Sequence, residues 1–571
     1  MLDLKKLTLT EVLRNSLESY PDNPSVGFVN SDPLTYSEFF NRVNQVSDFL
    51  HENGIISGDK VAILSENQPN WAIVFFAVTS IGAVLIPIMT EFHSSQVQHI
   101  INHSEAKALF VSSRFSDKLE GLSIPAIRLR IKLDDFSLLP EPEASDSLLS
   151  KPEFIKKILS DGAKEFARIK ESALKFLGKL PQQVEQESVA LIIYTSGTTG
   201  HSKGVILTHK NIVSNALSTL GFIQLDSSDR MLSIILPLFH TMESTLGLVI
   251  PFIRGASVYY IEKPPTPAVL LPALAKVKPT VMLAVPLIIE KIFRVRILPE
   301  LNRKFIIKSL YKLPAFRKKF HKIAAAKLMK TFGGELKLFC IGGASLSADV
   351  ERFLNEGSFP YAIGYGLTET SPLNTGTDPS EVRLRSAGKA IPDVQVKIDN
   401  PDTKTGEGEI LIKGPNVMIG YYKDPEKTKE VFTDDGWFKT GDLGIIDKDG
   451  YLFIKGRSKN VIIGSNGKNI YPEEIESILN ELDFVSESLV VERKGELTAK
   501  IFLNYETIEA MYKVTTSDDR KTRELVNEIL SGILKQVNER VNTFSRINKV
   551  VEQQEPFEKT PTQKIKRYLY N

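Results

Sequence analysis

Cysteine is almost absent from this chain: Cys340 is the only one among 571 residues. A single cysteine excludes an internal disulfide bond and fits a reducing compartment. Cys340 stands in the mostly apolar run 336–341, where a lone thiol is expected to pack in a core rather than serve as a nucleophile. Net charge is also nearly absent, at +2, so composition alone gives no argument for binding nucleic acid or membrane.

Long uninterrupted apolar runs are lacking as well. The run 71–89 has the length of a membrane span, but Gly82 and Pro87 interrupt it. A helix that ends at Gly82, followed by a strand over 83–88, explains the same residues, and we favour this interpretation over a membrane span. The N-terminal residues MLDLKKLTLTEVL have no basic start followed by an apolar core, so we see no signal peptide. We therefore expect a cytoplasmic protein.

The length of the chain exceeds that of one ordinary core and predicts two or more domains. Residues 1–115 alternate helical and short apolar segments, and the alternation resumes over 189–363, which favours layered, parallel α/β subdomains. Residues 130–188 read as a variable excursion. From 385 to 456, short strands separated by tight Gly/Asp turns predict a small antiparallel β-rich subdomain. After a boundary near Arg457, the pattern predicts a small α+β domain. The fold class is thus α/β, with domains 1–456 and 457–571.

The segment most informative about function is 194–209, YTSGTTGHSKGVILTH, with three glycines, six Ser/Thr hydroxyls and Lys203. Glycines let a backbone approach an oxyanion closely, and hydroxyls with exposed N–H groups form a nest for phosphate oxygens. The apolar residues 189–193 before it predict a buried strand, so the loop leaves a strand end. A plain surface loop is one alternative. A Walker A loop is another, but its spacing fails because Lys203 follows Ser202 and precedes Gly204.

Four further segments are weak signals when taken singly. GYGLTET (364–370) offers a hydroxyl, a carboxylate and an aromatic face, and Gly343 follows a predicted strand over 337–341. In WFKTGD (437–442), Asp442 could accept hydrogen bonds from a ribose diol or be an ordinary turn residue. Arg457 stands fifteen residues on, in KGRSKN. Lys564, in the terminal TPTQK, would alone be read as a solvated tail charge.

The order and approximate spacing of these five segments resemble those of the adenylate-forming superfamily, which includes acyl-CoA synthetases, luciferases and peptide-synthetase adenylation domains. The resemblance covers nearly the whole chain. It implies a ligase in which a carboxylate attacks the α-phosphate of ATP to give an acyl-adenylate and pyrophosphate, after which a thiol displaces AMP. The transition state is strongly anionic, so catalysis is expected to depend on positioned cations and hydrogen-bond donors.

The resemblance also implies roles for the matching residues in phosphate and metal binding. Thr368 is expected at the α-phosphate, and Glu369 is expected to bind Mg²⁺. The pyrophosphate oxygens are expected to contact Thr195, Ser196, Gly197, Thr198, Thr199 and Lys203.

The remaining implied roles concern the nucleoside and the C-terminal domain. Lys564 matches the lysine that bridges carboxylate and α-phosphate, and with Lys203, Thr368 and Glu369 it completes the expected catalytic set. Lys459 occupies the position of the hinge about which the small domain is thought to rotate between half-reactions, which makes that domain mobile. The nucleoside is expected to contact Tyr365 and Gly343 at the adenine, and Asp442 and Arg457 at the ribose.

Three features are similar to the long-chain fatty acyl-CoA synthetases. PLFHTME (237–243) matches their PLxHxxE pattern, in which His240 would line the acyl entrance, and 246–252 would line a tunnel. The segment 464–476 and the terminal TPTQK also fit that branch. The implied substrates are ATP, a fatty acid and CoA, in fatty acid and lipid metabolism. Two alternatives stay open: a fatty acyl-AMP ligase that loads an acyl carrier protein, and a non-catalytic acyl-binding or scaffold protein.

One region stands apart from these motifs. Residues 301–330 contain ten Lys/Arg and no acidic residue, in a chain that is nearly neutral overall. Lys304, Lys308 and Lys312 fall on one helical face, with apolar residues of 306–313 roughly opposite. A solvated helix that packs its apolar face on the core explains this pattern, as does attraction of CoA or another anionic nucleotide. A peripheral surface for anionic lipid is the third interpretation.

Overall fold

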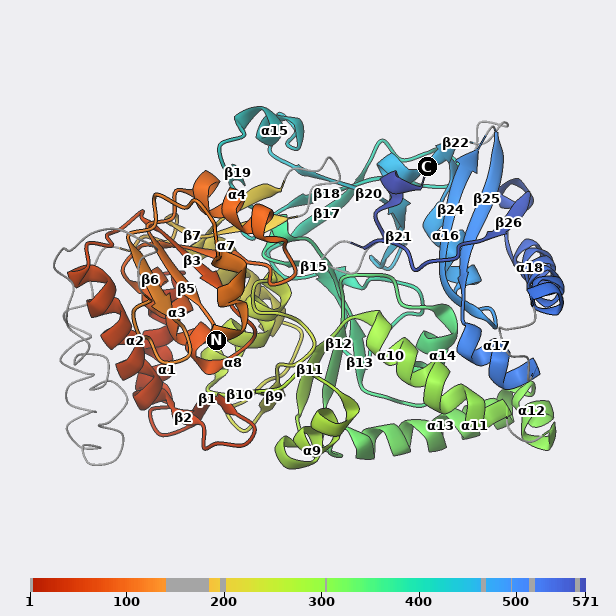
Figure 1. The fold of residues 1–571 in the computed structure, drawn as a ribbon, viewed down its shortest axis with the longest axis horizontal. Coiled ribbons are helices and arrows are strands. Elements are labelled where there is room, and N and C mark those ends of the chain that lie inside the picture. Colours follow the sequence, from red (N-terminus) through yellow and green to blue (C-terminus); the bar gives the residue numbers. More distant parts are fainter. Residues whose placement is uncertain are drawn as a thin grey trace.

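The computed structural model describes residues 4–139, 184–195, 202–302, 305–463, 469–493, 495–512, 519–559 and 565–570. Two seven-stranded sheets and their helices form the large N-terminal part of the molecule, which a small antiparallel sheet and a smaller C-terminal α+β part follow (Figure 1). The predicted α/β class with this order of parts is confirmed. The proposed boundary at 456/457 falls at the end of a strand and stays a prediction.

The first large sheet is parallel except at one edge. Its strand order is β13-β12-β11-β9-β10-β1-β2, and only the β1–β2 pair is antiparallel. The strands are β1 (Pro24–Phe28), β2 (Leu34–Thr35), β9 (Arg230–Leu232), β10 (Ser257–Tyr260), β11 (Val281–Ala284), β12 (Leu338–Ile341) and β13 (Tyr361–Ile363).

The second large sheet, in the order β19-β8-β7-β4-β3-β5-β6, corrects the expectation of uniformly parallel layers. Strand β7 pairs antiparallel with β8, and β8 pairs antiparallel with β19. The phosphate-loop segment therefore lies at a hairpin rather than at a strand-to-helix turn. The strands are β3 (Lys60–Leu64), β4 (Val84–Ile88), β5 (Ala108–Val111), β6 (Leu129–Lys132), β7 (Val189–Thr195), β8 (Lys203–Thr208) and β19 (Gly420–Tyr421).

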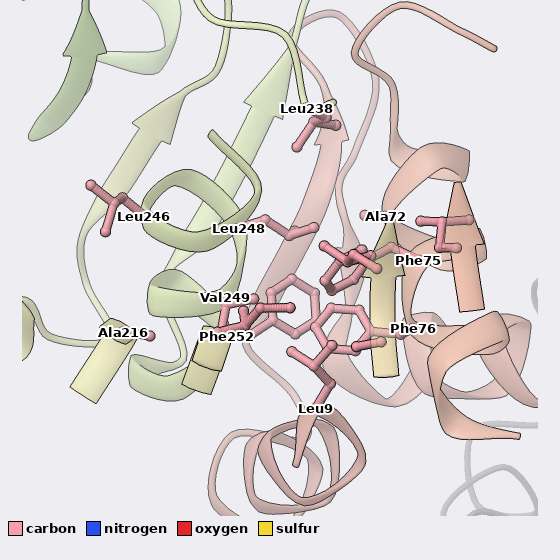
Figure 2. Packing of buried hydrophobic residues seen from close by; sticks show 14 of the residues in the cluster. Leu9, Ala72, Phe75, Phe76, Ala216, Leu238, Leu246, Leu248, Val249 and Phe252 are labelled. Atoms are coloured by element: carbon pink, nitrogen blue, oxygen red, sulfur yellow. The ribbon is translucent and has the colours of Figure 1, made fainter. Parts of the chain in front are cut away.

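A central layer of helices lies between the two sheets. One hydrophobic cluster contains residues of both, such as Val61 and Ile63 of β3 and Val258 of β10. Figure 2 shows Phe76 and Phe252 packed together beside Leu9; the Phe76 and Phe252 ring centroids are 4.8 Å apart. The helices of this layer include α1 (Leu9–Ser19), α2 (Tyr36–Glu52), α3 (Pro69–Ser80), α7 (His209–Leu220), the π-helix Met242–Val249 and α8 (Ile250–Arg254).

Helix α3 explains why residues 71–89 look like a membrane span. Every residue from Trp71 to Ser80 is buried, as expected of a helix that is apolar on all sides. The helix ends at Ser80 and β4 begins at Val84, so the predicted helix and strand are confirmed. Among the residues that the structure describes, no helix combines the length and apolar content needed to cross a bilayer.

The outer faces of both sheets are covered by further helices, which bury separate clusters. Helix α4 (Ser94–Ser104) packs on the second sheet. The first sheet contacts α9 (Pro267–Val277), α10 (Pro286–Ile292), α13 (Pro314–Thr331) and α14 (Ala348–Glu356). Between α10 and α13 the chain forms the π-helix Phe293–Ile297, α11 (Leu298–Asn302) and α12 (Phe305–Tyr311). Burial raises the pKa of the Cys340 thiol in β12 to about 12, which agrees with a packing role.

The predicted β-rich subdomain is a four-stranded antiparallel sheet in the order β17-β18-β20-β21, and three short strands precede it. The four strands are β17 (Gln395–Asp399), β18 (Gly408–Lys413), β20 (Phe438–Ile446) and β21 (Leu452–Arg457). The preceding strands are β14 (Tyr365–Gly366), β15 (Leu373–Gly376) and β16 (Lys389–Ala390), and α15 (Pro425–Glu430) lies between β19 and β20.

The C-terminal part has its own core, in which apolar residues of α18 pack against α16 and the β24–β25 hairpin. The elements are β22 (Ile462–Ile463), β23 (Asn469–Ile470), α16 (Pro472–Leu479), β24 (Val485–Arg493), β25 (Glu496–Leu503), α17 (Tyr505–Tyr512), α18 (Asp519–Arg540) and β26 (Lys549–Glu552).

His209 couples the N-terminal helix to the central layer. It is fully buried at the start of α7, and its Nδ1 accepts a hydrogen bond of 3.1 Å from the backbone N–H of Leu9 at the start of α1. Burial lowers the pKa of His209 from 6.5 to about 4. Between pH 6.5 and 4 the His209 imidazole is protonated in the unfolded chain but not in the folded one. The stability that the neutral imidazole contributes is therefore fully present above pH 6.5 and is lost as pH falls toward 4.

We expect the free energy of unfolding of His209→Gln to fall less steeply than that of the wild-type protein between pH 6.5 and 4. The glutamine amide oxygen can still accept from Leu9 but does not titrate. The wild-type protein should lose up to about 1.4 kcal/mol per pH unit through this group. Urea unfolding followed by tryptophan fluorescence at several pH values measures the difference, with the exposed His99→Gln as control. Equal pH dependence in the wild-type and His209→Gln proteins would contradict the assignment.

Candidate active site

The β7–β8 hairpin frames the expected phosphate site. Thr195, the last residue of β7, pairs in register with Lys203, the first residue of β8. Residues 196–201 lie outside the described residues, and with them the expected phosphate contacts of Ser196, Gly197, Thr198 and Thr199. The described residues therefore show where this loop starts and ends, at the last residue of β7 and just before the first residue of β8.

Tyr421 connects this hairpin to the GYGLTET segment. The two-residue strand β19 pairs with β8, which places the Tyr421 ring under Lys203; the ammonium lies 5.2 Å from the ring centroid. The Tyr421 hydroxyl donates a hydrogen bond of 3.0 Å to Oε1 of Glu369. Burial and the nearby Glu369 carboxylate raise the pKa of Tyr421, so the hydroxyl is a protonated donor at neutral pH. Lys203, Tyr421 and Glu369 form what we call the phosphate-side cluster.

A surface hollow of about 390 Å³ lies against this cluster. Lys203 and Tyr421 line it together with Gly204, Tyr422, Lys423 and Asp424, and Lys423 is paired with Glu105 at 2.8 Å, which leaves Lys203 as the charge nearest the hairpin. The Lys203 ammonium on this wall can attract an anion at the start of β8, next to the expected phosphate loop.

Asp442 is the centre of a second cluster. Its Oδ2 accepts a hydrogen bond of 2.7 Å from the Tyr365 hydroxyl, and its Oδ1 lies 2.7 Å from Nε of Arg457. Strands β20 and β21 align Asp442 opposite Arg457 in register. Burial and the Asp442 carboxylate raise the pKa of Tyr365. Each carboxylate oxygen keeps a second lone pair, so Asp442 can still accept from a diol. We call these three residues the ribose-side cluster.

The five residues 365–369 join the two clusters, because Tyr365 belongs to one and Glu369 to the other. Thr368 begins the 3₁₀ turn that contains Glu369 and is half-buried. Gly366 is required by packing: a Cβ there would lie 2.0 Å from the carbonyl oxygen of Pro372. Packing alone therefore explains why a glycine stands at position 366, whether or not a ligand binds nearby.

Gly343 follows β12 and has the open surroundings that a ligand ring would need. Its φ of +84° lies in the region that favours glycine, and a Cβ there would meet only Cγ1 of Val285, at 3.9 Å. The neighbouring Gly342 is more confined, since a Cβ would lie 3.0 Å from Sδ of Met242.

Of the two residues expected to act from the C-terminal domain, the structure describes Lys459 but not Lys564. Lys564 lies outside the described residues; on either side of it, Lys559 and Ile565 form an antiparallel bridge. Lys459 is exposed in the 3₁₀ turn Ser458–Asn460, between β21 and β22. His240 precedes the π-helix, with its ring centroid 4.6 Å from that of Phe239.

The expectation that 246–252 lines an acyl tunnel is wrong for Phe252. Its ring packs against Phe39 and Phe76 in the core, with centroid distances of 4.8 Å to each. Figure 2 shows the contact with Phe76. Sequence reasoning also missed two functional candidates. Tyr421 gave no signal, because only the pairing of β19 with β8 places it. Glu243 ends the PLxHxxE pattern and could have been singled out; its carboxyl is fully buried, which raises its pKa to about 8.

Comparisons with known proteins identify a family of AMP-binding enzymes. A family model described as AMP-binding enzyme matches residues 13–422, and one described as AMP-binding enzyme C-terminal domain matches residues 459–570. The putative acyl-CoA synthetase YngI of Bacillus subtilis (strain 168) is 30% identical over 515 residues, covering 86% of this chain and 86% of that protein. The long-chain-fatty-acid–CoA ligase FadD15 of Mycobacterium bovis is 30% identical over 572 residues, covering 94% of this chain and 90% of that protein.

Among solved structures, O-succinylbenzoate coenzyme A synthetase (MenE) from Bacillus subtilis, in complex with AMP, matches with a TM-score of 0.73. It is 22% identical, and the match covers 98% of this chain and 97% of that chain, which supports the fold alone. The family models and the 30% identical relatives confirm the resemblance read from the motifs, and they support adenylate-forming acyl-CoA synthetase activity, an acid–thiol ligase reaction. The chain belongs to the AMP-binding family of adenylate-forming enzymes.

Proposed function

We propose that the protein activates a long-chain fatty acid with ATP and transfers the acyl group to CoA. First, a carboxylate oxygen attacks the α-phosphorus, the bond from that phosphorus to the β-phosphate oxygen breaks, and pyrophosphate leaves. Next, the CoA sulfur attacks the acyl carbon, the acyl–oxygen bond to AMP breaks, and the thiol proton leaves to solvent. The observation that best supports this proposal is that residues 365–369 join the phosphate-side and ribose-side clusters.

The proposed roles follow from the charge that develops during adenylation. Negative charge on the phosphates is stabilised by positioned donors and cations, which here are Lys203, Thr368 and Lys564. Thr195 and the loop residues Ser196, Gly197, Thr198 and Thr199 add hydroxyl and backbone donors. On the other side, Asp442 and Arg457 hold the ribose, while Gly343 and Tyr365 flank the adenine.

Glu369 fits the metal that such a reaction uses. Oε1 of Glu369 accepts from Tyr421, and Oε2 can contact a cation. No group of three or more potential metal ligands occurs among the described residues. Proteins commonly hold Mg²⁺ through one or two carboxylates plus substrate phosphates, and Glu369 would supply one such carboxylate. When bound with ATP, Mg²⁺ would neutralise phosphate charge, and Tyr421 would orient the carboxylate that holds it.

The long-chain assignment rests on the PLxHxxE segment and on relatives named long-chain-fatty-acid–CoA ligase. We place His240 at the acyl entrance and expect chains of roughly 12–18 carbons, because each buried methylene contributes about 0.8 kcal/mol. Acetate and benzoate represent the rival substrate classes, and an acyl carrier protein is the rival acceptor.

We propose Lys459 as the pivot about which residues 457–571 rotate between the two steps. The exposed 3₁₀ turn that holds Lys459 directly follows β21, and a few residues with changed φ and ψ suffice for such a hinge. The rotation would exchange Lys564 for the surface through which the thiol enters.

The function is tested by pyrophosphate release with Mg·ATP and oleate, with and without CoA. We expect release that CoA strongly stimulates, with oleoyl-CoA as the product, and a kcat/KM far above those for benzoate, acetate and O-succinylbenzoate. Release without any thioester, even with CoA, would instead favour a carrier-protein acceptor. Absence of release with every acid would favour a scaffold protein.

Lys564→Ala should lower the rate of adenylation by at least about 10²–10³-fold, because a cation at the α-phosphate acts in that transition state. Thioester formation from supplied oleoyl-AMP should largely persist. Both half-reactions are measured separately, and Lys566→Ala, two positions along, is the matched control. Equal loss in both steps would rule out this division of labour.

Tyr421→Phe should raise the Mg²⁺ concentration needed for half-maximal adenylation and lower its rate about tenfold, since a hydrogen bond to a charged group is lost. The ring under Lys203 remains in this variant. Tyr422→Phe removes the neighbouring hydroxyl and serves as control. An unchanged Mg²⁺ requirement with a lower rate would mean that Tyr421 does not act through Glu369.

A further inference from the structure

The segment 305–331, which forms α12 and α13, presents an outward face that the proposed reaction does not use. In Figure 1, α13 runs along the lower edge of the molecule. Its inner side buries His321, Ala325 and Leu328. Phe316 and Ile323, seven residues apart, lie on the opposite side and are 43% and 51% exposed.

The apolar side chains of this region do not all pack on the core. Ile306 of α12 is 71% exposed and Leu313, between the helices, is 51% exposed, whereas Ile307 and Leu310 are half-buried. Val295, in the π-helix before α11, is exposed as well. A solvated helix with its apolar face on the core therefore accounts for only part of the pattern. Exposed large apolar residues gathered in one region indicate an interaction surface.

The same face is cationic. Six lysines of the segment are exposed, and none of them forms an ion pair with another described residue: Lys308, Lys312, Lys318, Lys319, Lys322 and Lys330. Helical spacing puts Lys319 and Lys330 on the same side of α13 as Phe316 and Ile323. By contrast, Arg317 points inward and lies 2.7 Å from Glu356 of α14, which ties α13 to the domain. Lys327 lies 3.6 Å from Glu300.

We propose that the outward face of α12 and α13 is a peripheral docking surface for an anionic lipid bilayer. Lysines near such a surface are attracted by its negative potential, and apolar side chains between them can enter the headgroup region. Either signal alone gives weak attachment, while the two together hold a protein reversibly without a spanning segment. The proposal goes beyond the catalytic function and does not depend on which acid is the substrate.

The test is co-sedimentation of the full-length protein with phosphatidylcholine vesicles that contain or lack phosphatidylglycerol, over a range of sodium chloride concentrations. We expect binding to the anionic vesicles that weakens as salt increases, and little binding to the neutral ones. Changing Lys308, Lys312, Lys319 and Lys330 to Gln should lower the partition coefficient at least about tenfold. Changing Ile306, Leu313 and Phe316 to Ser should remove the binding that persists at high salt.

The matched control replaces four exposed lysines of other surfaces, Lys5, Lys404, Lys429 and Lys448, with Gln, which changes the net charge equally. It should bind like the wild-type protein. No binding to anionic vesicles, binding that ignores the Lys308 set, or equal loss in the control would overturn the proposal. An increased KM for CoA in the Lys308 set, with vesicle binding unchanged, would overturn it in favour of nucleotide attraction.

Discussion

Two buried asparagine amides set the position of the segment on which the site depends. Asn215 of α7 donates to the carbonyl of Leu373 at 2.7 Å and accepts from its N–H at 3.2 Å. Asn416 donates to the carbonyl of Thr370 at 2.9 Å. Both asparagines are fully buried, so a displaced segment would leave amide groups without partners at a cost of about 1–3 kcal/mol each. These bonds anchor residues 370–373 and, with them, the preceding residues 365–369.

The anchored segment explains why the two clusters can serve one ligand. Tyr365 and Glu369 lie at opposite ends of the segment 365–369. The hydroxyl of Tyr365 donates a hydrogen bond to Asp442, and Glu369 accepts one from the hydroxyl of Tyr421. A buried tyrosine whose pKa is raised remains a donor, so both carboxylates are oriented while still able to accept or to bind a cation. Orientation before binding lowers the cost of ordering the site when the nucleotide arrives.

Much of this fold could be predicted because its parallel strands are buried on both faces and read as short apolar runs. The strand Ala108–Val111 follows from such a run. The helix before Val84 follows from an apolar run that Gly82 interrupts. The antiparallel direction of β8 could not be predicted, because the residue pattern of 203–208 is compatible with a parallel and with an antiparallel strand. Nor could Tyr421, which owes its place to a strand of two residues.

The solvent exposure of individual apolar side chains also could not be predicted from the periodicity of the sequence. Leu310 and Leu313 lie on the same face of an ideal helix, yet Leu313 is 51% exposed because α12 ends at Tyr311 and the chain turns before Pro314. Side chains beyond the end of a helix no longer follow its period. Phe252 shows the reverse case: an apolar run next to His240 suggested a tunnel, but three aromatic contacts place that ring in the core.

The contacts between the two domains bear on the proposed rotation. Each domain has its own hydrophobic clusters, and those of the C-terminal part contain only residues after 461. Across the boundary, the Tyr471 hydroxyl donates to Glu407 at 2.9 Å, and the carboxylate of Glu481 accepts from the N–H of Ala348, at the start of α14, at 3.1 Å. Both bonds can be exchanged for water when the domains separate, whereas a shared core could not be. A rotation about Lys459 would therefore leave the two cores intact while it breaks polar contacts of this kind and the packing of α16 on β21.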